Sequence, residues 1–297
     1  MDALSSLLEE EPYLVLDGAM GTLLIQAGLQ SGAAPEAWNL SNAGHVRESH
    51  TAYLEAGARV ILTNSFGGNP FRLARHGLAD STFELNRAAG QVAVSARDAA
   101  GSGSSRLVAG SMGPTGEMME PLGALTADRA RAGFAEQASG LGAGGVDLLW
   151  IETMGDLLEL RAAVLGARDR SDLPIAATMS FDAGGRTMMG ISPEQALSEL
   201  AELGLAAVGA NCGNGPEEIE EVMATMTTLD AGIPLIAKSN AGKPAWVDGE
   251  VAYDGSPEIM AKHALRLRQM GVRLIGGCCG TTPAHIRAMA ESLAEEA

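Results

Sequence analysis

The segment from residue 206 to residue 278 decides the fold class, because it contains the same unit three times. Its apolar runs are AAVGANC (206–212), PLIAKS (234–239) and VRLIGGC (272–278). Amphipathic helical patterns over 216–229 and 256–270 lie between these runs. Continuous rather than alternating apolar runs are typical of parallel strands that are buried on both faces. The segment therefore predicts parallel strands that are connected by helices.

The same unit continues on both sides of this segment and gives eight strands in all. Further strands are predicted at 13–17 (YLVLD), 59–63 (RVILT), 106–110 (RLVAG), 147–152 (DLLWIE) and 174–180 (PIAATMS), and further helices at 44–56, 82–100, 126–142, 156–167, 192–203 and 283–294. Eight strand–helix units in 297 residues indicate a (β/α)8 TIM barrel that forms one domain over 1–297. An open, doubly wound sheet is the alternative, but no G-x-G-x-x-G motif follows the first strand and no Walker A motif occurs.

Start signals support several of these helices. Ser41, Thr126, Ser192 and Ser256 are predicted to be N-caps, because a hydroxyl oxygen there can accept a hydrogen bond from the first helical turn. Proline follows two of these serines, at the first helical position that it favours.

The composition excludes several classes of protein. The chain has 20 basic and 37 acidic side chains, a net charge of −17, which argues against a surface for nucleic acid or for an anionic membrane. No apolar run reaches the roughly 18 residues of a membrane-spanning helix. The acidic start MDALSSLLEEE lacks the basic region of a secretory signal. Three cysteines are too few for a disulfide framework, so the cytoplasm is the expected location.

All three cysteines follow predicted strands, at the end of a barrel where chemistry collects. Cys212 ends the sixth predicted strand, and the pair Cys278 and Cys279 ends the eighth. Three thiolates that converge at one mouth would suit Zn2+ and leave a fourth coordination position open, as in catalytic zinc sites. The alternative is that the cysteines are small buried apolar residues.

Two acidic residues also end predicted strands. An unpaired buried carboxylate is costly, so Asp17 and Glu152 either bind the ammonium group of a ligand or form internal salt bridges or helix caps. The turn GAMGT (18–22) follows Asp17, and its N–H groups could hold a ligand carboxylate or form an ordinary tight turn. The five histidines lie mostly in helical patterns and are expected to face solvent or to pack.

Six short motifs make the chain resemble the homocysteine S-methyltransferase family over nearly its whole length. They are LDGAMGT (16–22), TNSFGGN (63–69), GSMGPTGE (110–117), WIETM (150–154), GANC (209–212) and GGCCGT (276–281). The segments SGAAPEAWN (31–39), EPLGALT (120–126) and GRTMMG (185–190) look like bacterial proteins assigned as betaine–homocysteine methyltransferases. The resemblance implies a (β/α)8 barrel that binds zinc and transfers a methyl group to homocysteine to form methionine.

The resemblance also implies roles for individual residues. Cys212, Cys278 and Cys279 match the zinc ligands of the family. Asp17 and Glu152 match the acidic residues that hold the amino group of homocysteine. The backbone at Gly18, Ala19 and Met20 matches the turn that receives its carboxylate.

The methyl donor is less closely defined. A quaternary ammonium donor such as betaine favours aromatic side chains through cation–π attraction, and the candidates are Trp38, Phe66, Phe181 and Trp246. Animal betaine enzymes place tyrosines after the second and fourth strands, where this chain has Gly67 and Thr153. S-methylmethionine, dimethylsulfoniopropionate or a methyl-corrinoid on a separate protein are therefore alternatives to betaine. A non-catalytic zinc- or thiol-binding barrel is a further alternative, and self-association into a homo-oligomer is left open.

Overall fold

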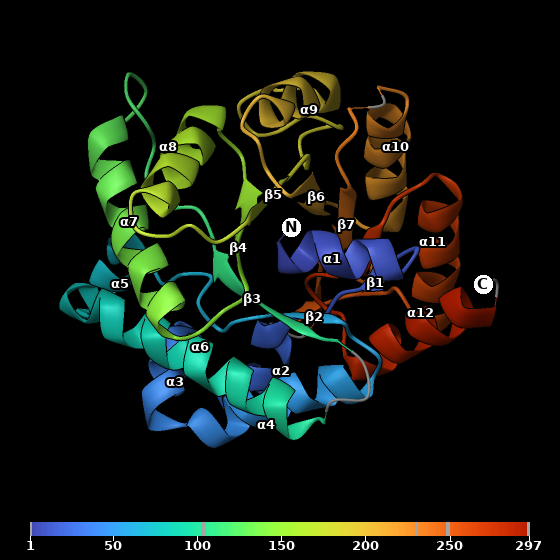
Figure 1. Cartoon of the computed structure of the whole chain (residues 1–297), viewed down its shortest axis with the longest axis horizontal. Coiled ribbons are helices and arrows are strands. Elements are labelled where there is room, and N and C mark those ends of the chain that lie inside the picture. The colour runs from blue at the N-terminus through green and yellow to red at the C-terminus, as the bar shows by residue number, and fades with distance from the viewer. Residues whose placement is uncertain (1, 102–104, 230, 248–249, 296–297) are drawn as a thin grey trace.

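Eight parallel strands follow one another around a barrel in the computed structural model, which describes residues 2–101, 105–229, 231–247 and 250–295 (Figure 1). The strands are β1 (Leu14–Val15), β2 (Val60–Leu62), β3 (Leu107–Met112), β4 (Leu148–Met154), β5 (Ile175–Met179), β6 (Ala207–Cys212), β7 (Leu235–Ser239) and β10 (Leu274–Gly277). Their order is β1-β10-β7-β6-β5-β4-β3-β2, and a pairing of Leu16 with Val60 joins the two ends. The predicted TIM barrel is confirmed, with a strand in each predicted run.

The eight predicted helices are also present. They are α4 (Ala43–Glu55), α6 (Thr82–Ala99), α7 (Ala127–Ala143), α8 (Leu157–Arg168), α9 (Pro193–Ala201), α10 (Pro216–Thr227), α11 (Pro257–Gln269) and α12 (Pro283–Glu295). Elements that were not predicted are α1 (Ala3–Glu10), α2 (Met20–Gln26), α3 (Trp38–Ser41), α5 (Pro70–Ala74) and a hairpin of β8 (Ala245–Val247) and β9 (Glu250–Ala252). These additions lie at the N-terminus or in loops after strands, where periodicity over a few residues is a weak signal.

Three of the four predicted caps are confirmed. The side chains of Thr126, Ser192 and Ser256 each accept a hydrogen bond from the first turn of the helix that follows. The prediction for Ser41 is wrong, because Ser41 ends the short helix α3, where its hydroxyl donates to the carbonyl of Ala37. Helix α4 instead begins after Asn42.

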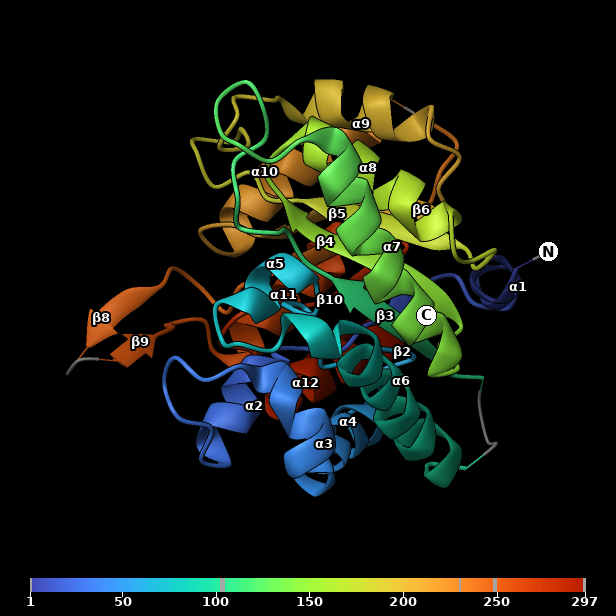
Figure 2. The same ribbon diagram turned by 90° about the vertical axis from the view of Figure 1, so that its left-hand side faces the viewer.

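The amino-terminal end of the barrel is closed by apolar side chains. Leu4, Leu7 and Leu8 of α1 belong to the same buried cluster as Leu14 and Trp150, which come from β1 and β4. Figure 2 shows α1 at one end of the barrel and the β8–β9 hairpin at the other. A larger apolar cluster includes Ile61 of β2 and side chains from the surrounding helices. The polar loops that follow the strands therefore collect at the opposite end from α1.

A search of the described ranges finds no helix that combines the length and the apolar character needed to cross a membrane.

Candidate metal and substrate site

A cavity of about 430 Å³ opens where the loops follow the strands, and it brings most of the predicted site residues together. Small-molecule pockets typically measure roughly 300–1,000 Å³. Its lining includes Asp17, Gly18, Ala19, Met20, Phe66, Glu152, Cys212, Cys278 and Cys279. The carboxyl ends of β1, β4, β6 and β10 position these side chains around one space, as the barrel topology requires.

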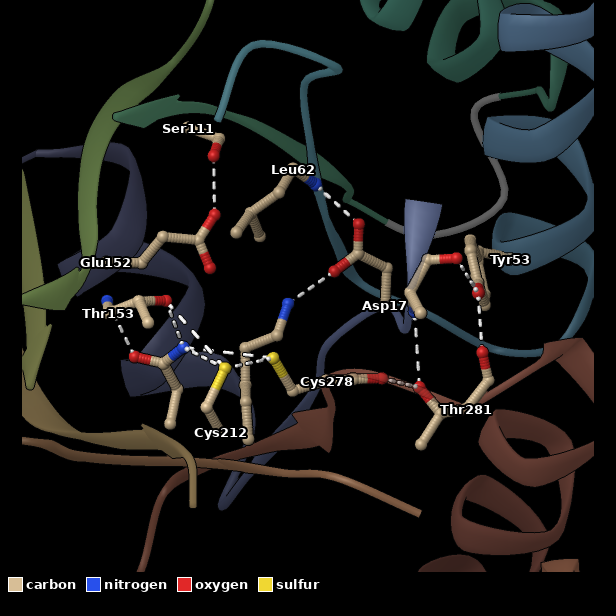
Figure 3. A network of polar contacts seen from close by, with 12 residues as sticks. Asp17, Tyr53, Leu62, Ser111, Glu152, Thr153, Cys212, Cys278 and Thr281 are labelled. Carbon is tan, nitrogen blue, oxygen red and sulfur yellow. Dashed lines mark hydrogen bonds and ion pairs between the residues drawn. The ribbon is translucent and has the colours of Figure 1, made fainter. Parts of the chain in front are cut away.

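The three cysteines form a cluster that could hold a metal ion. Their sulfur atoms all lie within 4.8 Å of one another, and the Sγ atoms of Cys212 and Cys278 are 3.0 Å apart (Figure 3). Tetrahedral zinc with bonds of about 2.3 Å to sulfur would place ligand sulfurs about 3.8 Å apart. Three soft sulfur donors at this spacing fit zinc and do not fit magnesium or calcium, which prefer oxygen.

The three thiols share their protons unequally. Hydrogen bonds with Cys278 and Cys279 raise the pKa of Cys212 well above its ordinary value. Hydrogen bonds with Cys212 and Cys278 lower the pKa of Cys279 to about 3. The first proton is thus lost from Cys279 more easily than from Cys212, and three thiolates at this spacing would need a bound cation to offset their repulsion.

A buried amide orders the backbone around the cluster. Thr153 and Cys212 have φ angles of 61° and 64°, a left-handed conformation that is strained for residues other than glycine. The Oδ1 atom of Asn211 accepts from the Thr153 N–H at 2.8 Å, and its Nδ2 atom donates to the Thr153 hydroxyl at 2.7 Å. The same Nδ2 atom lies 3.5 Å from the sulfur of Cys212 and 3.8 Å from that of Cys278. Asn211 therefore couples the strained backbone to two of the cysteines.

Asp17 forms an internal salt bridge, one of the two alternatives for this residue, and its partner Lys238 was not predicted. Its Oδ1 atom is 2.6 Å from Nζ of Lys238, its Oδ2 atom accepts from the Leu62 N–H at 2.7 Å, and both charged side chains are at most 3% exposed. Burial would lower the pKa of Lys238, but the carboxylates of Asp17 and Glu152 raise it above its ordinary value. Lys238 also lines the cavity. The lone lysine within the apolar run PLIAKS was the signal for this residue in the sequence.

Glu152 is buried beside the cysteines, and among the described residues one side chain donates a hydrogen bond to it. The Ser111 hydroxyl donates to its carboxylate (Figure 3). Burial raises the pKa of Glu152 to about 7, although the nearby Lys238 ammonium opposes this shift. A carboxyl group with this pKa can gain or lose a proton near neutral pH, and its ionised form would attract a ligand ammonium group.

The turn after β1 is tied to the loop that carries Cys278. The Ala19 N–H donates to the Thr281 hydroxyl at 3.2 Å, and the Tyr53 hydroxyl lies 3.1 Å from the Ala19 carbonyl (Figure 3). A Cβ atom on Gly18 would lie 2.6 Å from the Thr281 hydroxyl, so this close approach requires glycine. Among the described residues, the N–H groups of Gly18 and Met20 have no acceptor, whereas that of Ala19 is already engaged.

The structure separates the aromatic candidates. Phe66 lines the cavity, but the guanidinium of Arg72 lies over its ring, 5.1 Å from the centroid. Trp38 is not among the lining residues: its ring is 5.7 Å from that of His45, and it packs on the apolar side chains between α2 and α4. Phe181 is buried in the core of the barrel. The side chain of Trp246 lies outside the described residues.

Three charged or titratable residues that were not predicted line the outer part of the cavity. Glu36 is buried and accepts a hydrogen bond from the Gly67 N–H at 2.7 Å. Arg72 and His76 come from α5 and the turn that follows it, and His76 is exposed as expected. No sequence motif links residues 36, 72 and 76, because they meet at this cavity only in the folded chain.

Known proteins resemble this chain over almost its whole length. The family model described as homocysteine S-methyltransferase matches residues 14–293. Methionine synthases of Mycobacterium tuberculosis and Mycobacterium leprae are 35% and 33% identical to it over 294 and 296 residues, or 95% of this chain. The chain spans about a quarter of the length of these curated relatives, 24% of each.

Solved structures agree with this relationship. The metallated form of the homocysteine methyltransferase MmuM from Escherichia coli superposes with a TM-score of 0.82 at 26% identity, covering 97% of this chain and 99% of that one. The oxidized form of MmuM gives the same TM-score and identity over the full length of both chains. Because the family model covers nearly all of the sequence and the barrel carries its motifs around one cavity, this chain belongs to the homocysteine S-methyltransferase family.

Proposed function

We propose that this protein transfers a methyl group from a small onium donor to the thiol of homocysteine, with betaine as the first candidate donor. The products would be methionine and, from betaine, dimethylglycine. One observation carries this proposal: three cysteine sulfurs and two buried carboxylates line the same cavity. A thiol substrate that carries an ammonium group is complementary to both sets of groups.

The three cysteines are the proposed zinc ligands. Their sulfurs are close enough to share one ion, and a soft donor set of three leaves one position for a substrate. Zinc bound there would lower the pKa of a coordinated substrate thiol and so supply a nucleophilic sulfur at neutral pH. No side chain then needs to act as a general base.

The ammonium and carboxylate groups of homocysteine are proposed to lie against Glu152 and the turn after β1. Glu152 would hold its ammonium group as a carboxylate, with the proton of the free acid released to solvent on binding. Asp17 contributes negative charge but already has Lys238 as a partner, so its share in ammonium binding is smaller. The N–H groups of Gly18 and Met20 would receive the substrate carboxylate.

The reaction itself is a displacement at carbon. The homocysteine sulfur forms a bond to the methyl carbon, the bond from that carbon to the onium atom breaks, and the electron pair stays on the leaving amine or sulfide. Alignment of the three atoms is the main contribution expected from the cavity walls.

An assay of methionine formation tests this proposal. Reduced protein is loaded with zinc, its metal content is measured, and homocysteine is supplied with betaine, S-methylmethionine, dimethylsulfoniopropionate or methylcobalamin in separate reactions. Methionine with dimethylglycine from betaine supports the first candidate. Turnover with another donor alone would keep homocysteine and replace betaine. No turnover with any donor, in protein that holds one zinc, would contradict the proposal for small donors.

A methylated corrinoid carried by a separate protein is the second candidate donor. It is favoured by one observation, that the methionine synthases matching this chain have about three quarters of their length outside the matched region. Turnover with methylcobalamin and not with betaine would support this candidate.

A further inference from the structure

The wall of the cavity carries two opposite charges that attract each other without a direct contact. Glu36 comes from the loop after α2 and Arg72 from α5, and both line the same space as the cysteines. Within the described ranges they form no ion pair with each other. Each charge is therefore available to a ligand.

Arg72 is a cation without a hydrogen-bonded partner among the described residues: burial lowers the pKa of its guanidinium, and the nearby carboxyl groups of Glu36 and Glu159 oppose this shift. Its side chain is half-buried, and among the described residues its guanidinium makes neither a hydrogen bond nor an ion pair. Stacking on Phe66, with 5.1 Å between the guanidinium carbon and the ring centroid, fixes its position in the wall. An arginine remains charged in such surroundings, and its planar group matches a carboxylate with two parallel hydrogen bonds.

Glu36 is a buried carboxyl group: burial raises its pKa, while the hydrogen bond from Gly67 and the attraction of Arg72 oppose this shift. It is 5% exposed, its Oε1 atom accepts from Gly67, and its Oε2 atom has no donor in the described part of the chain. A Cβ atom at Gly67 would lie 2.8 Å from Oε1, so the glycine leaves room for this carboxylate. A buried carboxylate with a free oxygen attracts a cation from the cavity.

The aromatic ring that was expected to hold an onium group is already occupied. Phe66 has the guanidinium of Arg72 over its ring, so a second cation on that face would meet a like charge. Glu36, elsewhere in the lining of the cavity, is then the group that can attract the onium group. The two charges suit the two ends of one zwitterion.

We propose that Arg72 and Glu36 select a zwitterionic methyl donor, with Arg72 binding its carboxylate and Glu36 facing its onium group. This inference rests on the proposed methyl transfer and assigns recognition of the two charges of the donor to Arg72 and Glu36. Betaine, dimethylsulfoniopropionate and S-methylmethionine share this chemistry, and parallel assays with each distinguish them. Homocysteine is also a zwitterion, but its proposed partners lie on the wall nearer the cysteines.

Steady-state kinetics with paired donors test the inference. The variants are Arg72→Met and Arg72→Lys, and the control is Arg75→Met, which removes the same charge from the turn after α5 without touching the cavity. Arg72→Met should raise the KM for betaine roughly tenfold to a hundredfold, since a charge-assisted hydrogen bond is lost. Arg72→Lys should restore part of the affinity. The KM for homocysteine should stay within about twofold.

A donor that lacks a carboxylate distinguishes the role of Arg72 from that of Glu36. With trimethylsulfonium, Arg72→Met should have no effect, whereas Glu36→Gln should raise the KM for trimethylsulfonium and for betaine alike. The inference is overturned if Arg72→Met and Arg75→Met give the same KM for betaine, or if Arg72→Met raises the KM for homocysteine equally.

A binding measurement keeps this test separate from turnover. Calorimetry with zinc-loaded protein, saturated with homocysteine, gives the affinity for dimethylglycine in the wild type and in Arg72→Met. Weaker binding by the variant supports the inference even if no donor yields methionine. Equal binding by both proteins, or no binding to the wild type, overturns the inference even if methylcobalamin yields methionine.

Discussion

The two ends of this barrel are built from the same strands, but one buries apolar side chains and the other buries charged and polar ones. At the amino-terminal end, leucines of α1 and of the strands pack with Trp150 into a buried apolar plug. At the carboxyl-terminal end, the same strands lead into an ion pair, a buried glutamate and three thiols around a cavity. One end lowers the free energy of the folded state, whereas the other buries charges that are costly to desolvate.

Changes at the apolar end are expected to alter stability alone, whereas changes at the charged end also alter the site. Burial of apolar area is additive and needs no partner, so the plug can stabilise the barrel whatever the cavity binds. The charged end depends on pairing, because each group there is tolerable only with its partner or ligand. Four substitutions or conditions test this contrast, beginning with the largest expected effect.

The largest effect is expected from Cys279→Ser. A serine hydroxyl is a poor zinc ligand beside a thiolate, so bound zinc should fall and turnover should drop to background. The fold should remain, because a chain of 297 residues buries enough apolar area without a metal. Metal analysis, the methionine assay and circular dichroism measure the three properties. Global unfolding of this variant would contradict a purely catalytic role for the cluster.

The second effect concerns the buried ion pair. Lys238→Met leaves the carboxylate of Asp17 with the Leu62 N–H as its one remaining donor in the described part of the chain, and breaking a buried pair costs about 3–5 kcal/mol of unfolding free energy. Urea unfolding of the metal-free protein measures the loss. Adding Asp17→Asn should recover part of it, since the unpaired charge is then gone. If the double variant is no more stable than Lys238→Met, the pair does not carry this energy.

The third prediction addresses the apolar end. Leu7→Ala in α1 should lower the unfolding free energy by about 2–5 kcal/mol, since it removes a buried side chain from the plug. The KM values and kcat should not change at a temperature where the variant is folded. Leu40→Ala is a matched control, because Leu40 is 61% exposed and its loss should cost less than about 0.5 kcal/mol. A change in KM with Leu7→Ala would show that the two ends are coupled.

The strands of the barrel and their order could be predicted from the sequence. Runs such as RVILT and DLLWIE are continuously apolar because both faces of these strands are buried. This pattern can be recognised within each strand by itself. The cysteines and the two carboxylates were found because they directly follow such runs. Strand ends in a barrel converge whatever the side chains are, so their meeting point could be predicted.

The remaining site residues depend on contacts that no local pattern encodes. Lys238 lines the cavity and pairs with Asp17, which follows β1, and Arg72 reaches the cavity from a short helix of five residues. Trp38 lies within the segment SGAAPEAWN (31–39), but its ring packs on His45 and does not line the cavity. Side-chain direction in a loop is set by long-range packing rather than by position along the chain.

The smallest predicted effect is a pH dependence at the charged end. Burial raises the pKa of Glu152 to about 7, so this carboxyl is largely protonated at pH 6 and ionised at pH 8. If the ionised form binds the ammonium group, the KM for homocysteine should rise about tenfold as the pH falls from 8 to 6. Glu152→Gln should have a higher KM at pH 8 and lack this component of the pH profile. Identical profiles for both proteins would remove Glu152 from ammonium binding.

The pH dependence of stability should have the opposite sign. The folded protein holds the Glu152 proton up to a higher pH than the unfolded chain, so the unfolding free energy of the metal-free protein should fall as the pH rises from about 5 to about 8. The protonation state that binds substrate is then the one that destabilises the fold, as expected only at the end of the barrel where charge is buried for function.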